Sequence, residues 1–503
     1  MKKVIVIGAG ISGLAAGIYA QRSGFDVTIC EQHSIAGGMC TSWKRKGYMF
    51  EGAVHWMTGS GPRTVLYPVW KETGALRDDV KIFLHEPFCA VECEGHDIYL
   101  YRDIRKTAEH LAVVSPEDEK QLKRLVSDVK AFSRIQIPVY DIKGVKSENP
   151  KRMSIGSIFR MLPAFPVAGK LGKISCLDYT KQFTHTSIQR LLRFLPDDYS
   201  AISLIATLST LDSGDGGYPE GGSPAIVERM AKTFRDLGGN LLLNTKVMKV
   251  SIGNPAGTET AAVTGVMLDN GTSSGAPAAA DAVIVSQETI AAVNQLFDQP
   301  LRDEWLADLC KNTKPAVCTF VGVGIRAKIT QSPVPVWTLR EPIVCAGKTI
   351  TEIGFNNYAG FKGYAPEGCT TLTTAFMGDT YDFWKKAKDE GRYEDEKRRL
   401  ADQISRAICR KFPQAEGSIE VIDIATPLTY ERYTGAYHGS WMSIAGAGDK
   451  MKSYPGSVRG VSGLYFTGHR LMSPGGLPVA LTTGRSAAQM VCRQFGTVFK
   501  GRP

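Results

Sequence analysis

The chain has 503 residues, more than one compact core accommodates, so we expect two domains. Its 43% hydrophobic and 22% charged residues exclude a disordered chain, and no stretch reaches the ~20 uncharged apolar residues of a membrane-spanning helix. The net charge of +10 is compatible with binding to nucleic acid, with binding to a membrane surface or simply with solubility. The eleven scattered cysteines predict reduced thiols in a cytoplasmic protein.

The first thirty residues predict a strand, a Gly-rich turn, a helix and a second strand. Gly8, Gly10 and Gly13 fit the pattern G-x-G-x-x-G at the turn. The first Gly permits the turn, the second lets a pyrophosphate approach the backbone, and the third lets helix and strand pack closely. Glu31 ends the second strand, where an acid can hydrogen-bond a ribose hydroxyl and disfavours a 2′-phosphate. We therefore interpret the apolar run 4–20 as part of a dinucleotide site and not as a signal peptide.

The chain from Ser115 to about residue 211 predicts mostly helices, with Ser115 as the first helix cap. The segment 143–173 contains seven Lys or Arg and one acid. It also carries an apolar stripe at helical spacing, made of Ile155, Ile158, Phe159 and Leu162. Two interpretations remain open: an interfacial membrane helix, or a helix that packs its stripe on the protein.

A new unit of loop, helix and strand begins at residue 216 and leads to a further strand over 281–286. Strand-like runs then alternate with one highly charged helix over 385–411, whose charges predict a solvated face. The stretch 463–488 has an apolar strand, Gly468, a Pro-Gly-Gly loop and a helix-like run. Such a loop is typical of a site for a phosphate or a planar cofactor.

These motifs together resemble FAD-dependent oxidoreductases, the family of phytoene desaturases, carotenoid isomerases and retinol saturases and, more distantly, of amine oxidases. The resemblance rests on the Gly pair after Glu31, the run 47-GYMFEGAVHWMTG-59, the segment PEGGSPAIVERM and the C-terminal loop. It implies that Glu31 holds the adenosine ribose, that the Gly pair follows the pyrophosphate, and that the C-terminal loop closes over the isoalloxazine ring.

The resemblance also defines a predicted set of FAD-binding residues. Met39 departs from the family, which has an Arg there, and no counterpart of the cysteine that amine oxidases attach to FAD stands beside the C-terminal loop, so we expect non-covalent FAD. The predicted set is Gly8, Gly10, Ser12, Gly13, Glu31, Gly37, Gly38, Met39, Val247, Gly468, Gly475, Gly476, Leu477 and Pro478. No metal site is expected.

Two histidines beside the flavin motifs, His55 and His469, are the candidate catalytic residues, because imidazole exchanges a proton near neutrality. The alternative is that each only packs on the cofactor or hydrogen-bonds it, since the flavin itself carries the hydride chemistry. A cluster before the C-terminal loop predicts a substrate wall or ordinary core packing: Tyr430, Tyr433, His438 and Trp441.

The resemblance implies an FAD-dependent oxidoreductase that acts on a long hydrophobic substrate, a carotenoid, a retinoid or another isoprenoid or polyene lipid. Hydride transfer to or from flavin N5 would desaturate, saturate or isomerise it. A flavin amine oxidase is the first alternative, and a non-enzymatic escort protein for prenyl or lipid groups is the second. No nucleic-acid motif is present, and without a second G-x-G-x-x-G the electrons pass by a route other than a built-in nicotinamide site.

The expected fold is α/β, with a Rossmann-like FAD-binding domain around a parallel sheet and an inserted α+β substrate domain with a mixed or antiparallel sheet. The FAD-binding domain is predicted from residues 1–100, 215–295 and 440–503. The substrate domain is predicted from 101–214 and 296–439, with a candidate membrane-contact region near 143–195. The expected location is the cytoplasm, or the inner face of the membrane as a peripheral protein.

Overall fold

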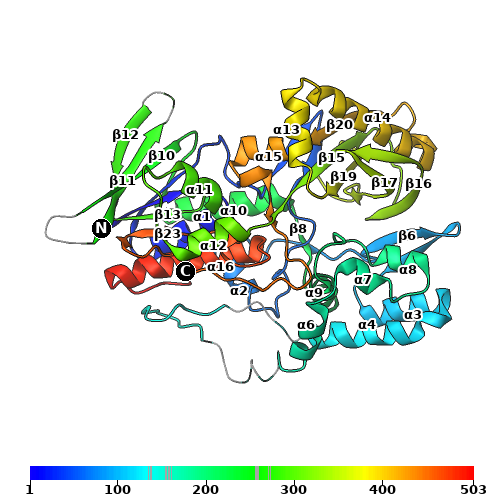
Figure 1. Cartoon of the computed structure of the whole chain (residues 1–503), viewed down its shortest axis with the longest axis horizontal. Coiled ribbons are helices and arrows are strands. Elements are labelled where there is room, and N and C mark those ends of the chain that lie inside the picture. Colours follow the sequence, from blue (N-terminus) through cyan, green and yellow to red (C-terminus); the bar gives the residue numbers. More distant parts are fainter. Residues whose placement is uncertain are drawn as a thin grey trace.

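A parallel sheet carries the N-terminal Gly motif and the C-terminal loop (Figure 1). Its strands lie in the order β23-β13-β1-β2-β9, so neighbours come from three distant parts of the chain. They are β1 (Lys3–Ile7), β2 (Asp26–Cys30), β9 (Asn240–Leu242), β13 (Ala282–Val285) and β23 (Leu464–Phe466). The central strands are apolar and buried, as a parallel sheet covered on both faces requires. This confirms the predicted α/β class.

Helices cover one face of this sheet, and a second layer covers the other. The first face packs against α1 (Ile11–Arg22), α10 (Gly222–Asp236) and α16 (Leu477–Phe495). The second packs against α11 (Thr289–Gln295), α12 (Glu304–Asn312) and an antiparallel sheet of β10 (Lys246–Gly253), β11 (Ala261–Asp269) and β12 (Ser274–Ala279), with β22 (Val461–Ser462) beside β11.

Two further sheets form the opposite lobe of the molecule, at the right of Figure 1. One has the order β18-β19-β15-β20, and the other has the order β17-β16-β6-β7. Their strands are β6 (Cys89–Cys93), β7 (His96–Leu100), β15 (Cys318–Ile325), β16 (Pro335–Cys345), β17 (Lys348–Gly354), β18 (Asn356–Asn357), β19 (Thr370–Met377) and β20 (Ile419–Ala425).

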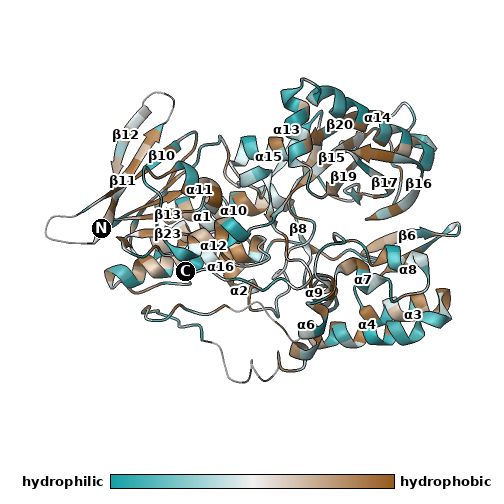
Figure 2. Cartoon of the chain, viewed as in Figure 1, coloured by the Kyte–Doolittle hydropathy of each residue, from teal (hydrophilic) through white to brown (hydrophobic). Residues whose placement is uncertain are grey.

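The charged helix predicted over 385–411 is two helices, α13 (Tyr381–Asp389) and α14 (Tyr393–Lys411), so the prediction of one helix was wrong. Gly391 lies between them with φ +72°, a left-handed conformation that ends α13. The predicted buried stripe of α14 is confirmed, because Leu400, Ile404 and Ile408 are buried. Figure 2 shows the strands beneath as hydrophobic and the outer helices as hydrophilic.

The region after Ser115 is helical, as predicted, and its first turn is fixed by the Ser115 hydroxyl bonded to Asp118 at 2.9 Å. Among the described residues, no helix is long and apolar enough to cross a bilayer. The elements after Ser115 are η1 (Pro116–Asp118), α4 (Glu119–Phe132), α6 (Ala164–Leu171), α7 (Cys176–Thr180), α8 (Thr186–Leu191) and α9 (Ala201–Asp212), and α3 (Ile104–Val114) precedes it.

Short elements join these layers. They are β3 (Ser42–Arg45), β4 (Tyr48–Glu51), α2 (Tyr67–Glu72), β5 (Ile82–Phe83), β8 (Tyr218–Pro219), β14 (Pro315–Ala316), η2 (Pro413–Ala415), α15 (Pro427–Thr434), η3 (Tyr437–Gly439), β21 (Met442–Ser443) and η4 (His469–Leu471). The computed structural model describes residues 1–133, 135, 139–152, 156, 159, 161–254, 260–269, 271 and 274–502. The predicted domain boundaries stay a prediction.

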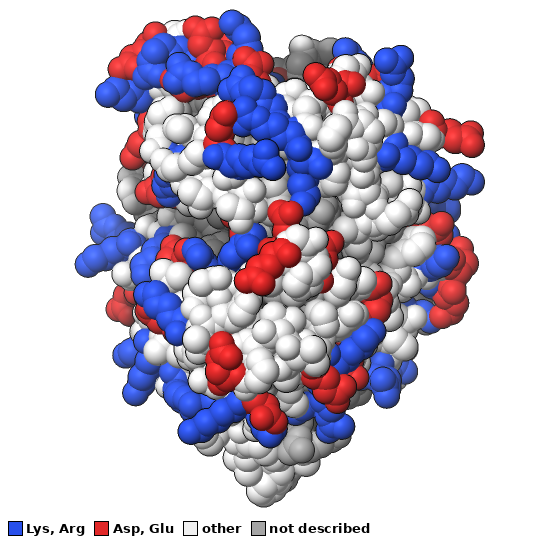
Figure 3. All heavy atoms as spheres, turned by 90° about the vertical axis from the view of Figure 1, so that its right-hand side faces the viewer, with Lys and Arg blue, Asp and Glu red and all other residues white. Residues whose placement is uncertain are grey.

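Positive charge is not confined to the basic segment 143–173. Figure 3 shows many Lys and Arg side chains on the face formed by the opposite lobe, interspersed with Asp and Glu. Arg340, Arg406 and Arg410 are exposed in this lobe. The net charge therefore has more than one surface origin.

Candidate functional site

The Gly-rich turn between β1 and α1 is built for close approach of the backbone. A Cβ on Gly13 would lie 2.0 Å from the carbonyl oxygen of Gly8, and Gly8 has φ +97°. A Cβ added to Gly10, by contrast, would meet only the Gly37 oxygen, at 3.9 Å. Gly10 is also the N-cap residue of α1, and no side chain there accepts a hydrogen bond from the first turn. The first N–H groups of α1 are therefore available to an anion, and the turn lines a large cavity.

Glu31 and the Gly pair complete this end of the cavity. The Glu31 carboxylate accepts hydrogen bonds from Ala9 N at 2.8 Å and His33 N at 2.9 Å, which ties the end of β2 to the turn. Gly37 bridges to Gly10, and its N–H donates to the Ala9 carbonyl. Met39 lines the cavity and packs with an aromatic cluster. This contact suits an apolar side chain, where the resemblance leads one to expect an Arg.

The C-terminal loop lies beside this turn because α16 packs on α1. A Cβ on Gly484 of α16 would lie 2.4 Å from the Ser12 carbonyl oxygen, so only Gly allows the two helices this contact. Gly468 donates its N–H to Thr483 Oγ1 at 3.1 Å, which fastens the end of β23 to α16. The loop between them lines the same cavity as the first turn, with Gly475, Gly476, Leu477 and Pro478. Val247 of β10 lines it as well.

The two candidate catalytic histidines both line the cavity. His55 Nδ1 lies 3.3 Å from Asn356 Nδ2 and 3.5 Å from the Tyr358 hydroxyl, and burial lowers the pKa of His55, although the charge of Glu51 opposes this. Burial, helped by the charge of Arg470, lowers the pKa of His469 to about 3. Both side chains are therefore neutral at physiological pH.

The predicted aromatic cluster divides into two groups. Tyr430, Tyr433 and Trp441 line the cavity. His438 is stacked between Tyr381 and Tyr437, with ring centroids 4.1 and 4.0 Å away, and is not among the described lining residues. Its position supports the segment that follows α15.

Sequence reasoning missed Glu51, Asn356 and Tyr358. Glu51 is fully buried, and its carboxylate accepts hydrogen bonds from Ala53 N and Val54 N, which shape the turn before His55. Asn356 and Tyr358 follow β17, about 300 residues from His55 in sequence. Glu51 could have been noticed, because it is the one acid in the otherwise mostly apolar run 47–59. No local sequence pattern marks Asn356 or Tyr358 as site residues.

The cavity fits an FAD molecule with room to spare. Its volume is about 2590 Å³, several times the ~300–1,000 Å³ of a common ligand pocket. Two buried nitrogens in its walls, His469 Nδ1 and Trp441 Nε1, have no hydrogen-bond partner among the described residues. Since buried polar groups are nearly always paired, these nitrogens suit a ligand with its own polar atoms. With the Gly-rich turns, they match the polar edges and pyrophosphate of a flavin dinucleotide.

Beyond the flavin motifs, the cavity is also lined by residues of the opposite lobe and of the helical region, and we call this part the arm. Its lining combines apolar side chains with polar ones such as Ser203, Thr207 and Asp215. Aromatic side chains line it, and Phe88 contacts both Trp56 and Phe194, each with ring centroids 5.9 Å apart. The far end is lined by residues of α6 and α9, among them Phe165, Ala168, Ile202 and Ala206.

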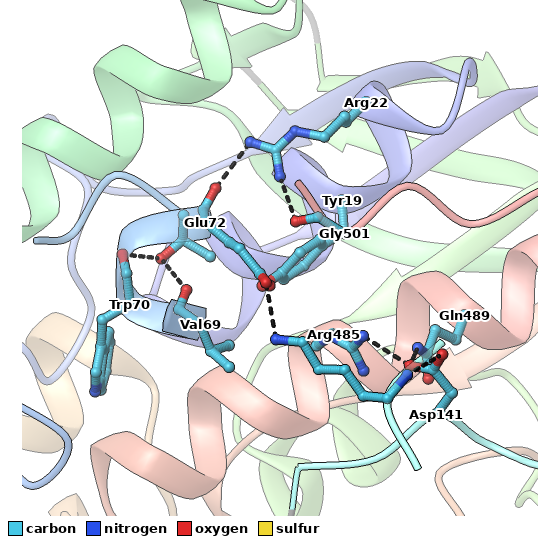
Figure 4. A network of polar contacts seen from close by, with 11 residues as sticks. Tyr19, Arg22, Val69, Trp70, Glu72, Asp141, Arg485, Gln489 and Gly501 are labelled. Atoms are coloured by element: carbon cyan, nitrogen blue, oxygen red, sulfur yellow. Dashed lines mark hydrogen bonds and ion pairs between the residues drawn. The ribbon is translucent and has the colours of Figure 1, made fainter. Parts of the chain in front are cut away.

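The basic segment 143–173 is partly fastened inside the protein. Lys151 is bonded to the buried Glu72 at 2.8 Å, and only 20% of its side chain is exposed, so it is an internal cation. Asp141 is bonded to the buried Arg485 of α16 (Figure 4). Phe159 and Leu162 of the predicted stripe are 66% and 48% exposed. Ile155, Ile158 and Arg160 lie outside the described residues.

The sequence profile of the family described as "Flavin containing amine oxidoreductase" matches residues 11–492. The chain belongs to this family. Membership confirms the resemblance stated from the motifs and the predicted FAD cofactor, which the first helix turn, Glu31 and the C-terminal loop would hold.

Individual relatives are more distant. The chain is 28% identical over 287 residues to the neurosporene-forming phytoene desaturase of Rhodobacter capsulatus, a match that covers 54% of this chain and 50% of that protein. The chain thus spans about half the length of the phytoene desaturases it matches. A 1-hydroxycarotenoid 3,4-desaturase of Flavobacterium sp. is 22% identical, with 98% and 99% of the two chains covered.

Solved structures show the same fold. A putrescine oxidase structure has a TM-score of 0.61 at 18% identity and covers 98% of this chain and 99% of its own. An oxidoreductase from Methanosarcina mazei has a TM-score of 0.58 at 17% identity, with 96% and 98% covered.

Proposed function

We propose that the protein is an FAD-dependent oxidoreductase that desaturates, saturates or isomerises a long apolar polyene or isoprenoid. The observation that carries the proposal is the arm, whose aromatic and aliphatic side chains line the cavity beyond the flavin motifs, in a cavity several times larger than a common ligand pocket. Bound flavin supplies hydride transfer, so the chain has to bind and orient the substrate and exclude water. The desaturase relatives support the same substrate class.

The carboxylates that line the cavity argue against an amine substrate. A cationic amine is held by a free carboxylate or by aromatic faces, and the first of these is missing among the described residues, because every described carboxylate in the lining already has a cation or an N–H or O–H partner. These carboxylates are Glu31, Asp212, Asp215, Glu288, Glu352, Glu394, Asp423 and Asp449.

His55 and His469 serve this function as neutral groups beside the flavin motifs. A neutral imidazole is a weak acid and a hydrogen-bond donor and acceptor, so it suits positioning of the cofactor and substrate. Tyr430, Tyr433 and Trp441 form part of the substrate wall in this proposal. His438 is not part of it, because its ring stacks on Tyr381 and Tyr437 instead.

Exposed apolar residues at the far end of the arm support loading from a membrane. Leu162 and Phe165 are 48% and 53% exposed, and Phe165 also lines the cavity. The exposed cations Lys170 and Lys173 lie close by in sequence. This combination suits the surface of an anionic bilayer, from which an insoluble substrate would enter.

The first test is an absorbance spectrum of the purified protein, with mass spectrometry of its organic extract. Flavin bands with a co-purified polyene or isoprenoid support the proposal. Anaerobic mixing with candidate polyenes and with aliphatic amines then compares the rates of change of the flavin spectrum. Rapid flavin reduction by an amine, with peroxide formed in air, would replace the proposal with an amine oxidase. A colourless protein that takes up no FAD would favour the escort alternative.

A further inference from the structure

Three polar side chains from distant parts of the chain meet in the wall of the cavity. His55 follows β4, Asn356 lies in β18 and Tyr358 lies just after it, and all three line the cavity. His55 Nδ1 receives the Asn356 amide at 3.3 Å, with the Tyr358 hydroxyl at 3.5 Å. Val334, Val336 and Phe355 line the cavity near them in sequence. We call these three residues the polar cluster.

The polar cluster is rigid. Tyr358 is 4% exposed and stacks on Tyr364, with ring centroids 4.8 Å apart and an angle of 9° between the rings. The turn before His55 is held by Glu51, which also accepts hydrogen bonds from Ser223 N and the Tyr218 hydroxyl at 3.0 Å each. A hydrogen-bonding site held in place by packing on both sides discriminates between ligands more sharply than a mobile one.

The hydrogen-bond pattern determines what the polar cluster offers. With the Asn356 amide nitrogen facing His55 Nδ1, the arrangement fits the neutral tautomer that carries its proton on Nε2. The cluster thus presents an imidazole N–H, an amide and a phenol, all uncharged. The nearest carboxylate, Glu51, is occupied by Ser223, Tyr218 and Tyr364. These groups match a neutral oxygen, which both donates and accepts hydrogen bonds if it is a hydroxyl.

We propose that the polar cluster binds an oxygen atom of the substrate, so that the substrate is an oxygenated polyene or isoprenoid with a hydroxyl or carbonyl group and not a pure hydrocarbon. This inference rests on the proposed function. A hydrocarbon packed against the cluster would remove water from the atoms that the cluster does not pair internally, His55 Nε2 and Asn356 Oδ1, at a cost of about 1–3 kcal/mol for each group. Sites built to bind a hydroxyl reject the analogue that lacks it by up to ~10⁴-fold for this reason.

The experiment compares two ligands that differ in one atom. FAD-loaded protein is titrated with all-trans-retinol and with its hydrocarbon analogue, in which hydrogen replaces the terminal hydroxyl. Binding is followed by quenching of tryptophan fluorescence. We expect the wild-type protein to bind the alcohol at least ~10-fold more tightly, because even one unpaired buried group costs about that much.

Asn356→Leu is the test variant, and Thr207→Val is the matched control. Thr207 also lines the cavity, on α9, and donates its hydroxyl to the Ser203 carbonyl of the same helix, so its loss leaves the cluster intact. Asn356→Leu should reduce the preference for the alcohol to within ~2-fold, with the hydrocarbon affinity kept, while Thr207→Val keeps the preference. Both variants should keep the FAD affinity and flavin spectrum of the wild type.

Three outcomes would overturn the inference. Equal affinity of the wild-type protein for the two ligands would mean that the polar cluster does not bind the substrate oxygen, while the proposed function would stand. A loss of FAD affinity in Asn356→Leu, with the alcohol preference intact, would assign the cluster to the flavin. Binding of neither polyene would overturn the proposed function and this inference with it.

Discussion

The buried ion pair between Arg485 and Asp141 joins α16 to the segment that leads into the basic region, so its loss should unfold the protein more easily. Arg485 Nη2 lies 2.7 Å from Asp141 Oδ1, with 2% and 9% of the two side chains exposed. The guanidinium also lies 4.8 Å from the centre of the Phe499 ring. Arg485→Met removes the cation and keeps an apolar side chain of similar length.

The expected loss follows from what remains after the substitution. Asp141 would keep the Gln489 amide at 2.6 Å and the Lys151 N–H at 3.1 Å, but its charge would stay buried without a cation (Figure 4). Removing one partner of a buried pair costs about 3–5 kcal/mol, and the lost contact with Phe499 adds about 1 kcal/mol. We therefore expect the free energy of unfolding to fall by about 4 kcal/mol.

Urea unfolding of the FAD-loaded protein, followed by tryptophan fluorescence, measures this change through the midpoint and slope. Arg493→Met is the control, because Arg493 lies on the same helix and is exposed. Adding Asp141→Asn to Arg485→Met should recover part of the loss, because it removes the unpaired buried charge. The recovery is only partial, since the amide oxygen accepts from just one of the two remaining donors, Gln489 Nε2 and Lys151 N. A midpoint for Arg485→Met no lower than that of Arg493→Met would refute the reasoning.

The same pair predicts acid sensitivity. Burial raises the pKa of Asp141, but its hydrogen bonds and the charge of Arg485 outweigh burial and hold the pKa below its usual range. The unfolded chain therefore binds this proton at a higher pH than the folded chain does. The stabilisation is complete above pH ~4 and is lost as the pH falls through the folded value. In Arg485→Met this part of the pH dependence should be reduced.

Further predictions concern the flavin site and the surface. Gly10→Val should fold, because its Cβ position is free of close contacts, and should lower FAD affinity at least ~10-fold; a fully loaded yellow variant would contradict this. Since the pKa of His469 is about 3 when folded and ~6.5 when unfolded, the stability of the FAD-free protein should fall between pH 6.5 and 5, and His469→Gln should weaken that fall in thermal melts. The double variant Leu162→Ser, Phe165→Ser should sediment less with phosphatidylglycerol vesicles, because both side chains are exposed and apolar. Lys151→Gln should leave sedimentation unchanged and lower the stability of the protein, because Lys151 is bonded to the buried Glu72. Equal vesicle binding by the wild type and the double variant would remove the membrane proposal.

The parts of the cofactor site that depend on local backbone conformation were predictable. Gly8 needs a positive φ, and Gly13 has no room for a Cβ, so the requirement for Gly is written into neighbouring positions of the chain. Glu31 could be placed because a strand of known direction ends there. Helix boundaries were harder, as the break at Gly391 shows, since Gly occurs within many helices as well as at their ends.

The role of Lys151 could not be read from its segment. Seven cations and an apolar stripe are the same pattern whether the charges face lipid or a buried acid. Glu72, 79 residues earlier in the chain, decides between the two for Lys151. Only the packed structure brings that acid to it.

The sequence by itself determined the family, the α/β class and the Gly-rich turns that are predicted to hold FAD, because these rest on short spacings that leave the backbone few alternatives. Tertiary structure alone decided the lining of the large cavity and the polar cluster. Asn356 and Tyr358 reach His55 across about 300 residues, and their side chains acquire a role only when an antiparallel sheet carries them to the cavity wall. Such contacts depend on how whole layers pack, and no local spacing encodes them.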